Sequence, residues 1–596
     1  YIYPAVKHGI SWDIHADEGR GAPLDTPRDL PANIAAGIAD VAQRGDWNRS
    51  APADFALPTE IWREVVARRT RYAETRAKLA NGEVREINDL ITLNLDIRQF
   101  AQDVIERCEG PDLLRAFWKA IENVTVLDPT CGSGAFLFAA LNILEPLYAA
   151  CLDRMEAFVA DRQRASGKEE DNPKGFREVL ARIEAHPNAR YFILKSIILN
   201  NLFGVDIMEE AVEICKLRLF LKLAAQVEPD MRAANLGIEP LQDIAYTIRS
   251  GNTLVGFTTY GNVSRSFSGK LDLSGALDRI KIRASDAQQA FSAFRRSQIN
   301  ADTSVPTVEK QEVRRRLTEL SDELDLTLAS EFGVKSSNDL LLKKWKRLHE
   351  PLHWFVEFHG IMLDGGFDVI VGNPPYVASS KIGYLSSAQK ALKFPDIYAH
   401  VALRSLEILS KGGRCGMIIP LSITFSEDFL KLRAEIAKHG ERWYSSFDNI
   451  PAAVFSGVSQ RSTIWLSAPS GESTNVSQMY RWRSSGRPNL VNQISYTSLP
   501  QNNVGVRGIS KISSPWSREF MRKVSQSGEK KKREILAVGR LGGVRLGFSQ
   551  AARNFISVFL EDPPCLDATS LASVEPSKIG DIKLSNEDAA FASLAA

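Results

Sequence analysis

The stretch GGFDVIVGNPPYV, at residues 365–377, decides the fold. Its centre, DVIV at 368–371, is the short, largely apolar run expected of a strand buried on both faces of a parallel sheet. Pro374 and Pro375 then end the strand, because proline has a fixed φ and no N–H to donate. We therefore expect a rigid loop at the carboxyl end of a central strand, which is where open α/β sheets bind their ligands.

A glycine-rich turn lies upstream, in VLDPTCGSGAFL at 126–137. Gly132 and Gly134 permit positive φ and a close approach of a ligand to the backbone. The helix that follows points its first N–H groups at the turn. The spacing is GxG and no Lys-Ser/Thr follows, so the turn is neither a standard dinucleotide fingerprint nor a P-loop. Taken alone, it is equally well explained as a tight connection between strand and helix.

A second acidic element lies in LFGVDI, where Asp206 ends another hydrophobic strand. Rossmann-like folds place the acid that binds ribose hydroxyls at this position. Asp206 follows Asp128 by 78 residues instead of the usual ~20, so the connection between them must be an elaborated crossover. Strand-like runs alternate with helical ones along this region, which predicts βαβ units and a parallel sheet.

Length, composition, net charge and cysteine count limit the possible classes of protein. The 596 residues are 44% hydrophobic, which is enough for several cores. A net charge of +2 gives no overall basic character, so any surface that binds nucleic acid must be local. Six cysteines without a CxxC pair favour a reduced, cytoplasmic protein. We find no apolar run of about 18 residues and expect no membrane span. The chain starts at Tyr1 without Met, so we expect a fragment.

The order DPTCGSGAFL, GVDI, GNTL and NPPY resembles that of amino-methyltransferases that use S-adenosylmethionine, and in particular the gamma group of adenine-N6 DNA methyltransferases. Longer stretches at 90–108, 351–377 and 396–420 resemble large phage-defence methylases. These include the DISARM and BREX methylases and the type IIG restriction enzymes, of which we favour the DISARM methylase. The resemblance covers about 57–470 and is weak beyond.

The resemblance implies a Rossmann-like α/β methyltransferase with a helical insertion, an N-terminal helical region and a C-terminal mixed α/β target-recognition domain. The regions that we expect are an extended and helical segment at 1–110, the cofactor half of the core at 111–264, a helical insertion at 265–350, the catalytic half at 351–470, and a truncated recognition domain at 471–596.

The NPPY loop is the predicted catalytic element. The amine of adenine is a poor nucleophile, so its N–H groups need two fixed acceptors, for which we choose the side-chain oxygen of Asn373 and the backbone carbonyl of Pro374. Pro375 adds stiffness, and Tyr376 offers a flat face to a base flipped out of the duplex. The transfer would be a direct in-line displacement. In the family pattern, Asn373 favours adenine over cytosine.

By the same resemblance, Asp128, Gly132 and Gly134 would contact the methionine part of the cofactor, and Asp206 its ribose. Asn252, which would lie near the adenine ring of the cofactor, is as readily explained as a turn residue. The full set of predicted cofactor-binding residues is Asp128, Pro129, Thr130, Gly132, Gly134, Phe136, Asp206, Ile207 and Asn252.

Further candidates have a plain structural explanation as well. Phe447 and Phe455 each have two interpretations: a second stacking surface for the flipped base, or a residue of the hydrophobic core. Locally basic C-terminal segments are either solvated loops or contacts to DNA phosphates, and their candidate residues are Arg481, Arg483, Lys530, Lys531, Lys532 and Arg533. Three histidines at 349, 353 and 359 are better explained by packing beside tryptophans than as ligands, and we expect no metal.

We predict an S-adenosylmethionine-dependent adenine-N6 DNA methyltransferase that marks self DNA in a bacterial defence system. Its partners would be double-stranded DNA and, as candidates, further subunits of that system. An RNA or protein-glutamine methyltransferase is the alternative enzyme, although the length and the C-terminal region argue against it. A DNA-binding sensor with a methylase fold is the alternative without catalysis, and the intact NPPY argues against that.

Overall fold

The computed structural model describes residues 29–499 except for gaps at 58–59, 167–174, 230, 232–243, 260, 264–281, 284, 287–288, 290–306, 335–338 and 456–459, and beyond 499 it describes 508–509, 511, 544–549, 558–559 and 579–584. The chain divides into two compact units, Tyr1–Ser514 and Pro515–Ala596. The second unit carries an antiparallel sheet in the order β11-β10-β12, whose strands are β10 (Val544–Ser549), β11 (Val558–Phe559) and β12 (Ile579–Leu584).

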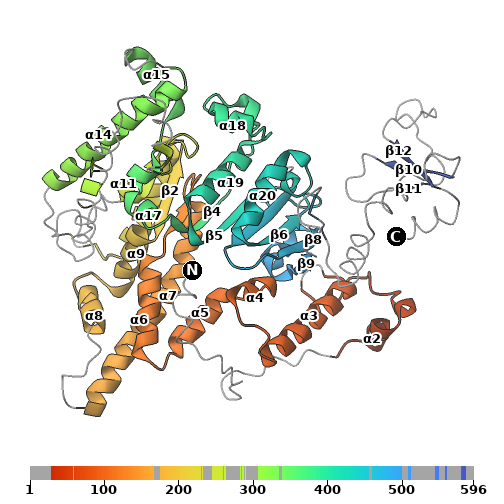
Figure 1. Cartoon of the computed structure of the whole chain (residues 1–596). Coiled ribbons are helices and arrows are strands. Elements are labelled where there is room, and N and C mark those ends of the chain that lie inside the picture. Colours follow the sequence, from red (N-terminus) through yellow and green to blue (C-terminus); the bar gives the residue numbers. More distant parts are fainter. Residues whose placement is uncertain are drawn as a thin grey trace. The chain divides into compact units, whose positions relative to one another are not determined.

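The first unit is built on a nine-stranded sheet in the order β3-β2-β1-β4-β5-β7-β6-β8-β9 (Figure 1). The first five strands in this order pair in parallel, and β7 is antiparallel to both β5 and β6. Sequence order reverses between β1 and β4, which makes this the switch point where such sheets bind ligands. The strands are β1 (Val126–Asp128), β2 (Leu202–Asp206), β3 (Ile248–Ser250), β4 (Phe367–Gly372), β5 (Leu409–Pro420), β6 (Glu441–Phe447), β7 (Ser462–Ala468), β8 (Thr474–Tyr480) and β9 (Thr497–Leu499).

Side chains fix the register of the two central strands at their amino ends. The backbone N–H and the hydroxyl of Thr125 donate to Asp368 Oδ2 at 3.0 and 2.9 Å, and the Asp368 N–H donates to Thr125 Oγ1 at 3.0 Å. Val126 then lies opposite Val369. As a result, β1 and β4 end at the same edge of the sheet, although they are more than 230 residues apart in sequence.

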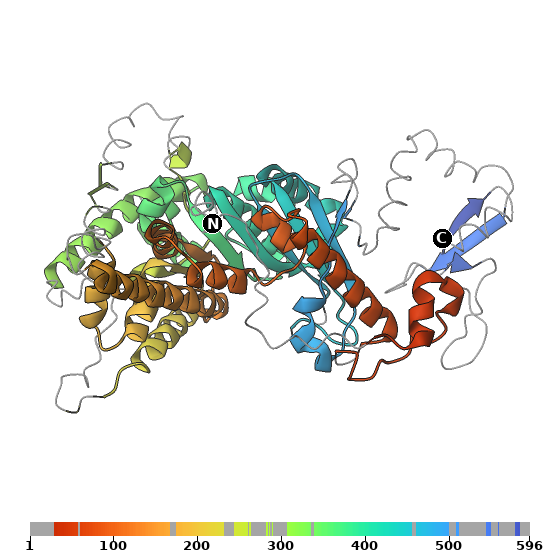
Figure 2. The ribbon, with the colours of Figure 1, turned by 90° about the horizontal axis from the view of Figure 1, so that it is seen from below.

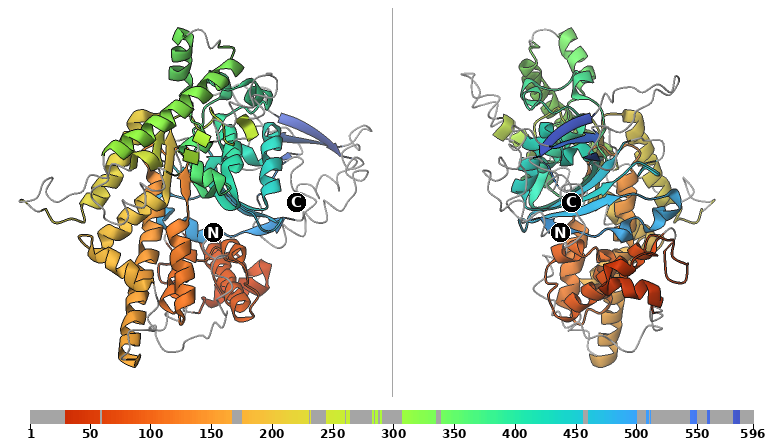
Figure 3. Two further views of the ribbon diagram at one scale, coloured as in Figure 1. Left: turned by 60° about the vertical axis from the view of Figure 1, so that its left-hand side comes forward. Right: turned by 90° about the vertical axis from the view of Figure 1, so that its right-hand side faces the viewer.

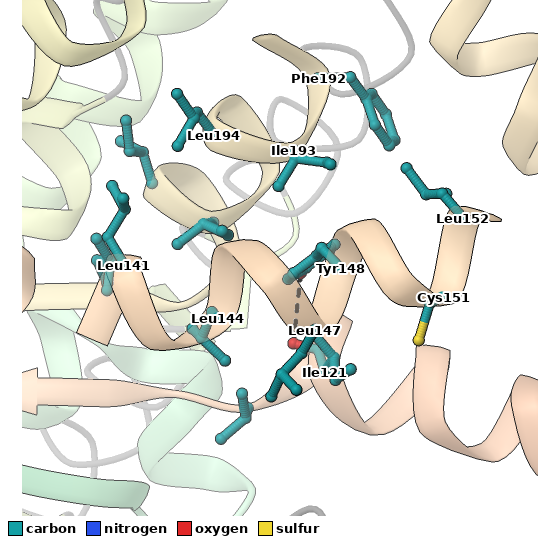
Figure 4. Close-up of a cluster of buried hydrophobic side chains, with 14 of the residues drawn as sticks. Ile121, Leu141, Leu144, Leu147, Tyr148, Cys151, Leu152, Phe192, Ile193 and Leu194 are labelled. Atoms are coloured by element: carbon teal, nitrogen blue, oxygen red, sulfur yellow. Dashed lines mark hydrogen bonds between the residues drawn. The ribbon is translucent and has the colours of Figure 1, made fainter. Parts of the chain in front are cut away.

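Helices of the cofactor half cover one face of the sheet, and Figure 4 shows part of their shared core. Leu141, Tyr148 and Met155 are fully buried there, and the Tyr148 hydroxyl donates to the Ile121 carbonyl. The helices are α5 (Ile97–Glu106), α6 (Pro111–Asn123), α7 (Ala135–Ser166), α8 (Phe176–Glu184), α9 (Ala189–Asn200), α10 (Glu209–Ala224) and α11 (Ile244–Thr247).

The long helix α7 meets the length and hydropathy criteria for a membrane span, although the sequence has no uninterrupted apolar run of about 18 residues. Within the described part of the chain, Ala135–Asp161 passes that test on length and hydropathy. The contacts of α7 with α5, α6 and α9 explain this apolar composition, because they place one side of the helix in the core. Pro146 interrupts the helical ladder without ending the helix.

The other face of the sheet is covered by short helices that follow the insertion and by the helices of the catalytic half (Figure 2). Trp354, Phe367 and Tyr398 are fully buried in this second core. The helices are α16 (Trp354–Glu357), α17 (His359–Leu363), α18 (Ser387–Ala391), α19 (Ile397–Ile408) and α20 (Leu430–His439). Single 3-10 turns are η2 (Val41–Gln43), η5 (Ser379–Lys381), η6 (Leu421–Thr424), η7 (Glu427–Phe429), η8 (Ser484–Asn489) and η9 (Val491–Gln493).

The helical insertion between β3 and β4 contains α14 (Thr307–Glu331) and α15 (Asp339–His349), which contact each other (Figure 3). Leu320, Leu324 and Leu328 recur every four residues along α14 and lie in one cluster with Trp345. His349 stacks on Trp345, with ring centroids 4.9 Å apart, as expected of a packing histidine.

The N-terminal region differs in one respect from the sequence analysis. The helical pattern of the sequence at 87–108 predicts one continuous helix, but the structure has α4 (Ile87–Thr92) and then α5. Asn94 adopts a φ of 54°, and Asp96 caps α5 by accepting from Gln99 N at 3.0 Å. Asparagine tolerates this left-handed conformation and aspartate favours helix N-caps, so both residues break the helix locally. The remaining helices are α2 (Ala32–Ala39) and α3 (Trp62–Ala80).

The main sheet continues across the domain boundary that we expected at 470/471. Strand β8 pairs with β6, and β9 pairs with β8, so the compact unit extends to Ser514. Helix α3 holds the segment before β9: the Arg71 guanidinium donates to the carbonyls of Asn492, Gln493 and Ile494 at 2.8 to 3.2 Å. The N-terminal region and residues 474–499 are therefore one structural body with the sheet.

A buried asparagine at the start of β2 provides a test of the fold. Asn201 Nδ2 donates to the carbonyls of Ile121 and Val124, both at 2.8 Å, and its Oδ1 accepts from the Tyr148 hydroxyl at 3.0 Å. We expect Asn201→Ala to lower the free energy of unfolding by about 3 kcal/mol, because buried polar groups lose their partners. Tyr148→Phe should lower it by about 1 kcal/mol. Urea denaturation followed by tryptophan fluorescence measures both, with the exposed Asn81→Ala as control. Equal effects of the two buried substitutions would contradict this account.

Candidate active site

The glycine-rich turn after β1 is tied to the end of β2. Gly132 N donates to Asp206 Oδ2 at 2.8 Å, and Met208 N donates to Asp206 Oδ1 at 2.9 Å. Cys131 N donates to the Val205 carbonyl at 2.9 Å. The structure therefore brings Asp206 to the turn across the long crossover. Each carboxylate oxygen has a second lone pair, so Asp206 can still accept from a ligand hydroxyl.

The two glycines of the turn have the positive φ that the sequence predicted, 51° at Gly132 and 86° at Gly134. A Cβ at Gly134 would come within 2.5 Å of Cys215 Sγ on α10, so a side chain at that position would collide. Arg218, also on α10, donates to the carbonyl and hydroxyl of Ser133 at 2.5 and 3.1 Å. Nothing in the local sequence around Arg218 indicated this contact.

Asp128 lies where the turn after β1 meets the loop after β4. A Cβ added at Gly372 would come within 2.9 Å of Asp128 Oδ1, which shows how closely the β4 backbone passes. Asp128 is only 1% exposed, and its Oδ1 accepts from Thr130 N at 3.1 Å. Burial raises the pKa of Asp128 to about 7; the Thr130 N–H opposes this shift and the charge of Asp206 adds to it. The carboxyl group is therefore poised to ionise near neutral pH.

Asn252 follows β3 and belongs to the same edge of the sheet. Its Oδ1 accepts from Leu254 N at 3.0 Å, while its Nδ2 is buried and has no hydrogen-bond partner among the described residues. The next residue, Thr253, donates its hydroxyl to the Pro129 carbonyl, and Trp354 Nε1 donates to the Thr253 carbonyl at 3.2 Å. These contacts join the Asn252 segment to the glycine-rich turn. A buried amide N–H2 without a partner is the donor that a bound heterocycle would satisfy.

The NPPY loop is held rigidly by its own tyrosine. The Tyr376 hydroxyl hydrogen-bonds to Asn373 Oδ1 at 2.7 Å and to the Ile418 carbonyl of β5 at 3.0 Å. Asn373 is half-buried, Pro374 is buried and Pro375 is exposed. Burial raises the pKa of Tyr376, so the hydroxyl stays protonated and remains a donor. The side-chain oxygen of Asn373 therefore has a fixed position at the end of β4.

The start of α19 supports the far end of the same loop. Ser379 N donates to the Pro395 carbonyl at 2.7 Å, and Ile397 N donates to the Val377 carbonyl at 2.9 Å. Tyr398 lies edge-on to Tyr376, with ring centroids 6.3 Å apart, and is fully buried. The backing of Tyr376 by a core aromatic limits the movement of the half-buried ring.

The two candidate stacking residues have different environments. Phe447, at the end of β6, is 1% exposed and packs against Tyr480 in a separate cluster, so it has no open face for a base and we withdraw it. Phe455 is half-buried and stays a candidate. Its loop is fixed by Arg487, which donates to the carbonyls of Ala453 and Val454 at 3.1 and 2.9 Å.

Of the other predicted residues, Pro129 is buried, Thr130 and Phe136 are half-buried, and Ile207 is 37% exposed beside Asp206. Arg481 is ion-paired with Asp448, and Arg483 is exposed after β8. The basic run at 530–533, with Lys530, Lys531, Lys532 and Arg533, lies outside the described residues. The described residues contain no group of three His, Cys, Asp or Glu side chains that could hold a metal ion.

The strand order, with the glycine-rich turn after β1 and NPPY after β4, is that of a Rossmann-like S-adenosylmethionine-dependent methyltransferase, and the predicted fold class is confirmed. Two methylase families match parts of the chain. The Eco57I restriction-modification methylase family matches residues 200–443, and the DNA-methyltransferase domain of MmeI matches residues 103–255. Together they cover both motifs. A fold of this class implies S-adenosylmethionine as the cofactor.

A curated relative from Methanocaldococcus jannaschii, provisionally described as a type II restriction enzyme and methyltransferase, is 27% identical over 417 residues. That alignment covers 63% of this chain, which spans only about a third (32%) of the relative. Solved structures with a weak likeness include the type ISP restriction-modification enzyme LlaBIII bound to DNA (TM-score 0.33, 10% identity, 76% of this chain and 24% of that one). MmeI in complex with DNA is a second such structure (TM-score 0.33, 14% identity, 71% and 41%). Neither likeness is strong enough to support a function.

The raised pKa of Asp128 predicts how stability changes with pH. The folded protein binds a proton at Asp128 up to about pH 7, whereas the unfolded chain releases it near pH 4. The contribution of protonated Asp128 to the free energy of unfolding is therefore fully present below about pH 4 and is lost as the pH rises toward 7. We expect the Tm of Asp128→Asn to rise relative to wild type by at least ~2 °C between pH 5 and pH 8. Thermal unfolding at several pH values checks this, and a constant difference would contradict it.

Proposed function

We propose that this chain is the methyltransferase part of a restriction-modification enzyme. It transfers a methyl group from S-adenosylmethionine to the N6 amine of a flipped adenine in a specific double-stranded DNA site. The observation that supports this most directly is the approach of Gly372 to Asp128, which joins the predicted cofactor turn to the predicted catalytic loop. The matches to two restriction-modification methylase families support the same class of reaction.

The residues around the turn fit the cofactor. Gly132 and Gly134 leave the backbone accessible, and Asp206 is fixed beside them to accept from ribose hydroxyls. The buried Asn252 Nδ2 needs an acceptor, which a ring nitrogen of the cofactor's adenine provides. Ionised Asp128 would favour a bound positive charge. When bound, S-adenosylmethionine supplies a methyl group on a positively charged sulfur.

The NPPY loop activates the acceptor amine. The lone pair of an exocyclic adenine nitrogen is delocalised into the ring, so the nitrogen must become pyramidal before it can attack. Asn373 Oδ1 and the Pro374 carbonyl accept its two N–H groups and stabilise that geometry. Because Tyr376 and the prolines fix the loop before the substrate arrives, these acceptors need no reorganisation during the reaction.

The transfer is a single displacement. Asn373 and Pro374 would hold the amine nitrogen toward the methyl group that a bound S-adenosylmethionine would supply, and the sulfur would leave with the electron pair of its bond to the methyl carbon. The methylated amine then releases one proton to solvent through the acceptors that held it. Tyr376 stacks on one face of the flipped base, and Phe455 is the candidate for the other face.

The biological setting is part of the proposal. Methylation would protect the DNA of a bacterial cell from its own restriction or phage-defence system, in the cytoplasm and with other subunits as candidate partners. The similarity to restriction-modification methylases supports this setting. The assignment to a DISARM, BREX or type IIG system stays a prediction.

Modification-sensitive sequencing tests the proposed function. The full-length protein and its Asn373→Ala variant are each expressed in a bacterial host that lacks DNA methylation. We expect N6-methyladenine at one sequence motif with the wild type and none with the variant. Purified variant should still bind the cofactor, as measured by calorimetry, which separates a lost acceptor from lost folding. Methylation of RNA or of a protein glutamine, without any DNA mark, would contradict the proposal.

Substitutions of Tyr376 separate its two roles. We expect Tyr376→Phe to lower kcat about 2- to 10-fold, because the ring remains and only the hydrogen bonds to Asn373 and Ile418 are lost. Tyr376→Ala should lower kcat by a further ~10-fold or more, because the stacking face is lost as well. Single-turnover assays with a duplex that contains the motif measure both rates. A full loss of activity in Tyr376→Phe would show that the hydroxyl, not the ring, is the main contribution.

A further inference from the structure

A buried carboxylate after β6 gathers two arginines that are far from it in sequence. Asp448 Oδ1 accepts from Arg461 Nε at 3.0 Å, and Asp448 Oδ2 accepts from Arg481 Nε at 3.1 Å. The side chain of Asp448 is 1% exposed, whereas those of Arg461 and Arg481 are 33% and 39% exposed. The buried carboxylate thus holds the two arginines by their Nε atoms, while their side chains stay partly exposed to solvent.

Asp448 is ionised and is shared by two arginines. Burial alone would raise the pKa of Asp448, but hydrogen bonds from Arg461, Asn449 N–H and Arg481 outweigh it, so the pKa lies below its usual value and the group is ionised. Lys511 adds a third cation; burial, and next the charge of Arg461, lower its pKa. Lys511 is near enough to Arg461 for their charges to interact, so Lys511 and the two partly exposed arginines form a local group of three cations.

The cluster lies at the edge of the sheet that carries the NPPY loop. Both β5 and β6 are antiparallel to β7, so they run in the same direction as β4. Ser462 at the start of β7 pairs with Pro420 at the end of β5 and with Phe447 at the end of β6. Since β7 is two strands from β4, Arg461 starts about 10 Å from the strand that ends in Asn373.

Backbone contacts keep the cluster in place beside the candidate stacking loop. Leu421 N donates to the Arg461 carbonyl at 3.0 Å, and Asp448 N donates to the Tyr480 carbonyl at 2.9 Å. Lys511 lies over the ring of Phe425, with its Nζ 5.7 Å from the centroid. The three cations therefore come from three separate segments that the fold holds at one edge.

We propose that Arg461, Arg481 and Lys511 bind backbone phosphates of the target strand next to the flipped adenine. This inference rests on the proposed function and names the surface on which the DNA strand is held. Phosphate contacts of this kind position a duplex without reading its sequence. Asp448 is a positioning residue, because it orients the two guanidinium groups and would not itself touch DNA.

The salt dependence of DNA binding tests the proposal with the full-length protein and a duplex that contains its methylation motif. Each lost phosphate contact lowers the slope of log K against log salt by about 0.9. We expect Arg461→Gln, Arg481→Gln and Lys511→Met each to lower the slope by about this amount and to weaken binding roughly 10-fold at low salt. Lys411→Gln, an exposed cation near the amino end of β5, is the matched control and should change neither quantity.

A duplex with a neutral methylphosphonate beside the target adenine locates the contact. It should bind wild type more weakly than the unmodified duplex, and the difference should disappear in Lys511→Met. Lys511 is used here because no hydrogen bond of Asp448 depends on it, so a folding defect is a lesser concern. Unchanged slopes in all three variants, from a wild type that binds and methylates DNA, would overturn the inference and leave the cluster a structural tie. A wild type that neither binds nor methylates DNA would instead refute the proposed function.

Discussion

The parallel pairing of β1 with β4 is the constraint on which the rest of this structure depends. Thr125 and Asp368 fix its register through three hydrogen bonds at one end of the strands. At the other end, the same pairing places Asp128 beside Gly372. The glycine-rich turn and the NPPY loop therefore meet, although an entire helical insertion separates them in sequence. Any shift of one residue would turn each side chain of the strand to the opposite face and would separate the two turns.

Around this pair, the loops are tied to one another more than to their own strands. Asp206 holds the glycine-rich turn, Thr253 holds the segment after β3, and Tyr376 joins its loop to β5. Such cross-links make an edge of the sheet that is set before a ligand binds, which is the condition for electrostatic catalysis. Asn252 Nδ2 and Thr130 Oγ1 at this edge are buried without a hydrogen-bond partner among the described residues, and such unsatisfied groups are the kind that a ligand can satisfy.

The parts of the fold that were predictable are those in which local residues determine the outcome. The strand before NPPY, the glycines with positive φ and the helices of the insertion each appear in the structure as expected. Strands β6 and β7 were not foreseen, because β6 buries polar residues such as Ser445 and Ser446, whose partners come from other strands and loops. The break between α4 and α5 was missed as well: Asn94 adopts a left-handed conformation there, and its side chain donates to the distant carbonyls of Val491 and Ile494. The same holds for the candidate site. Motifs predicted its turns, but Arg218, Thr253 and Arg461 belong to no motif, and only their contacts across the fold reveal them.

For the proposed methyltransferase, the contacts between α3 and the segment before β9 limit where the C-terminal part could be exchanged to change the DNA specificity. Arg71 and Asn94 together hold the carbonyls of residues 491–494, so this segment is a piece of the catalytic body even though it follows the last catalytic motif by more than a hundred residues. A graft that begins upstream of it would remove the acceptors of a guanidinium group and open the edge of the sheet at β9. Ile509 also packs in the second core and donates its N–H to the Thr424 carbonyl, so the natural junction for such a chimera lies after Ser514, where the first compact unit ends.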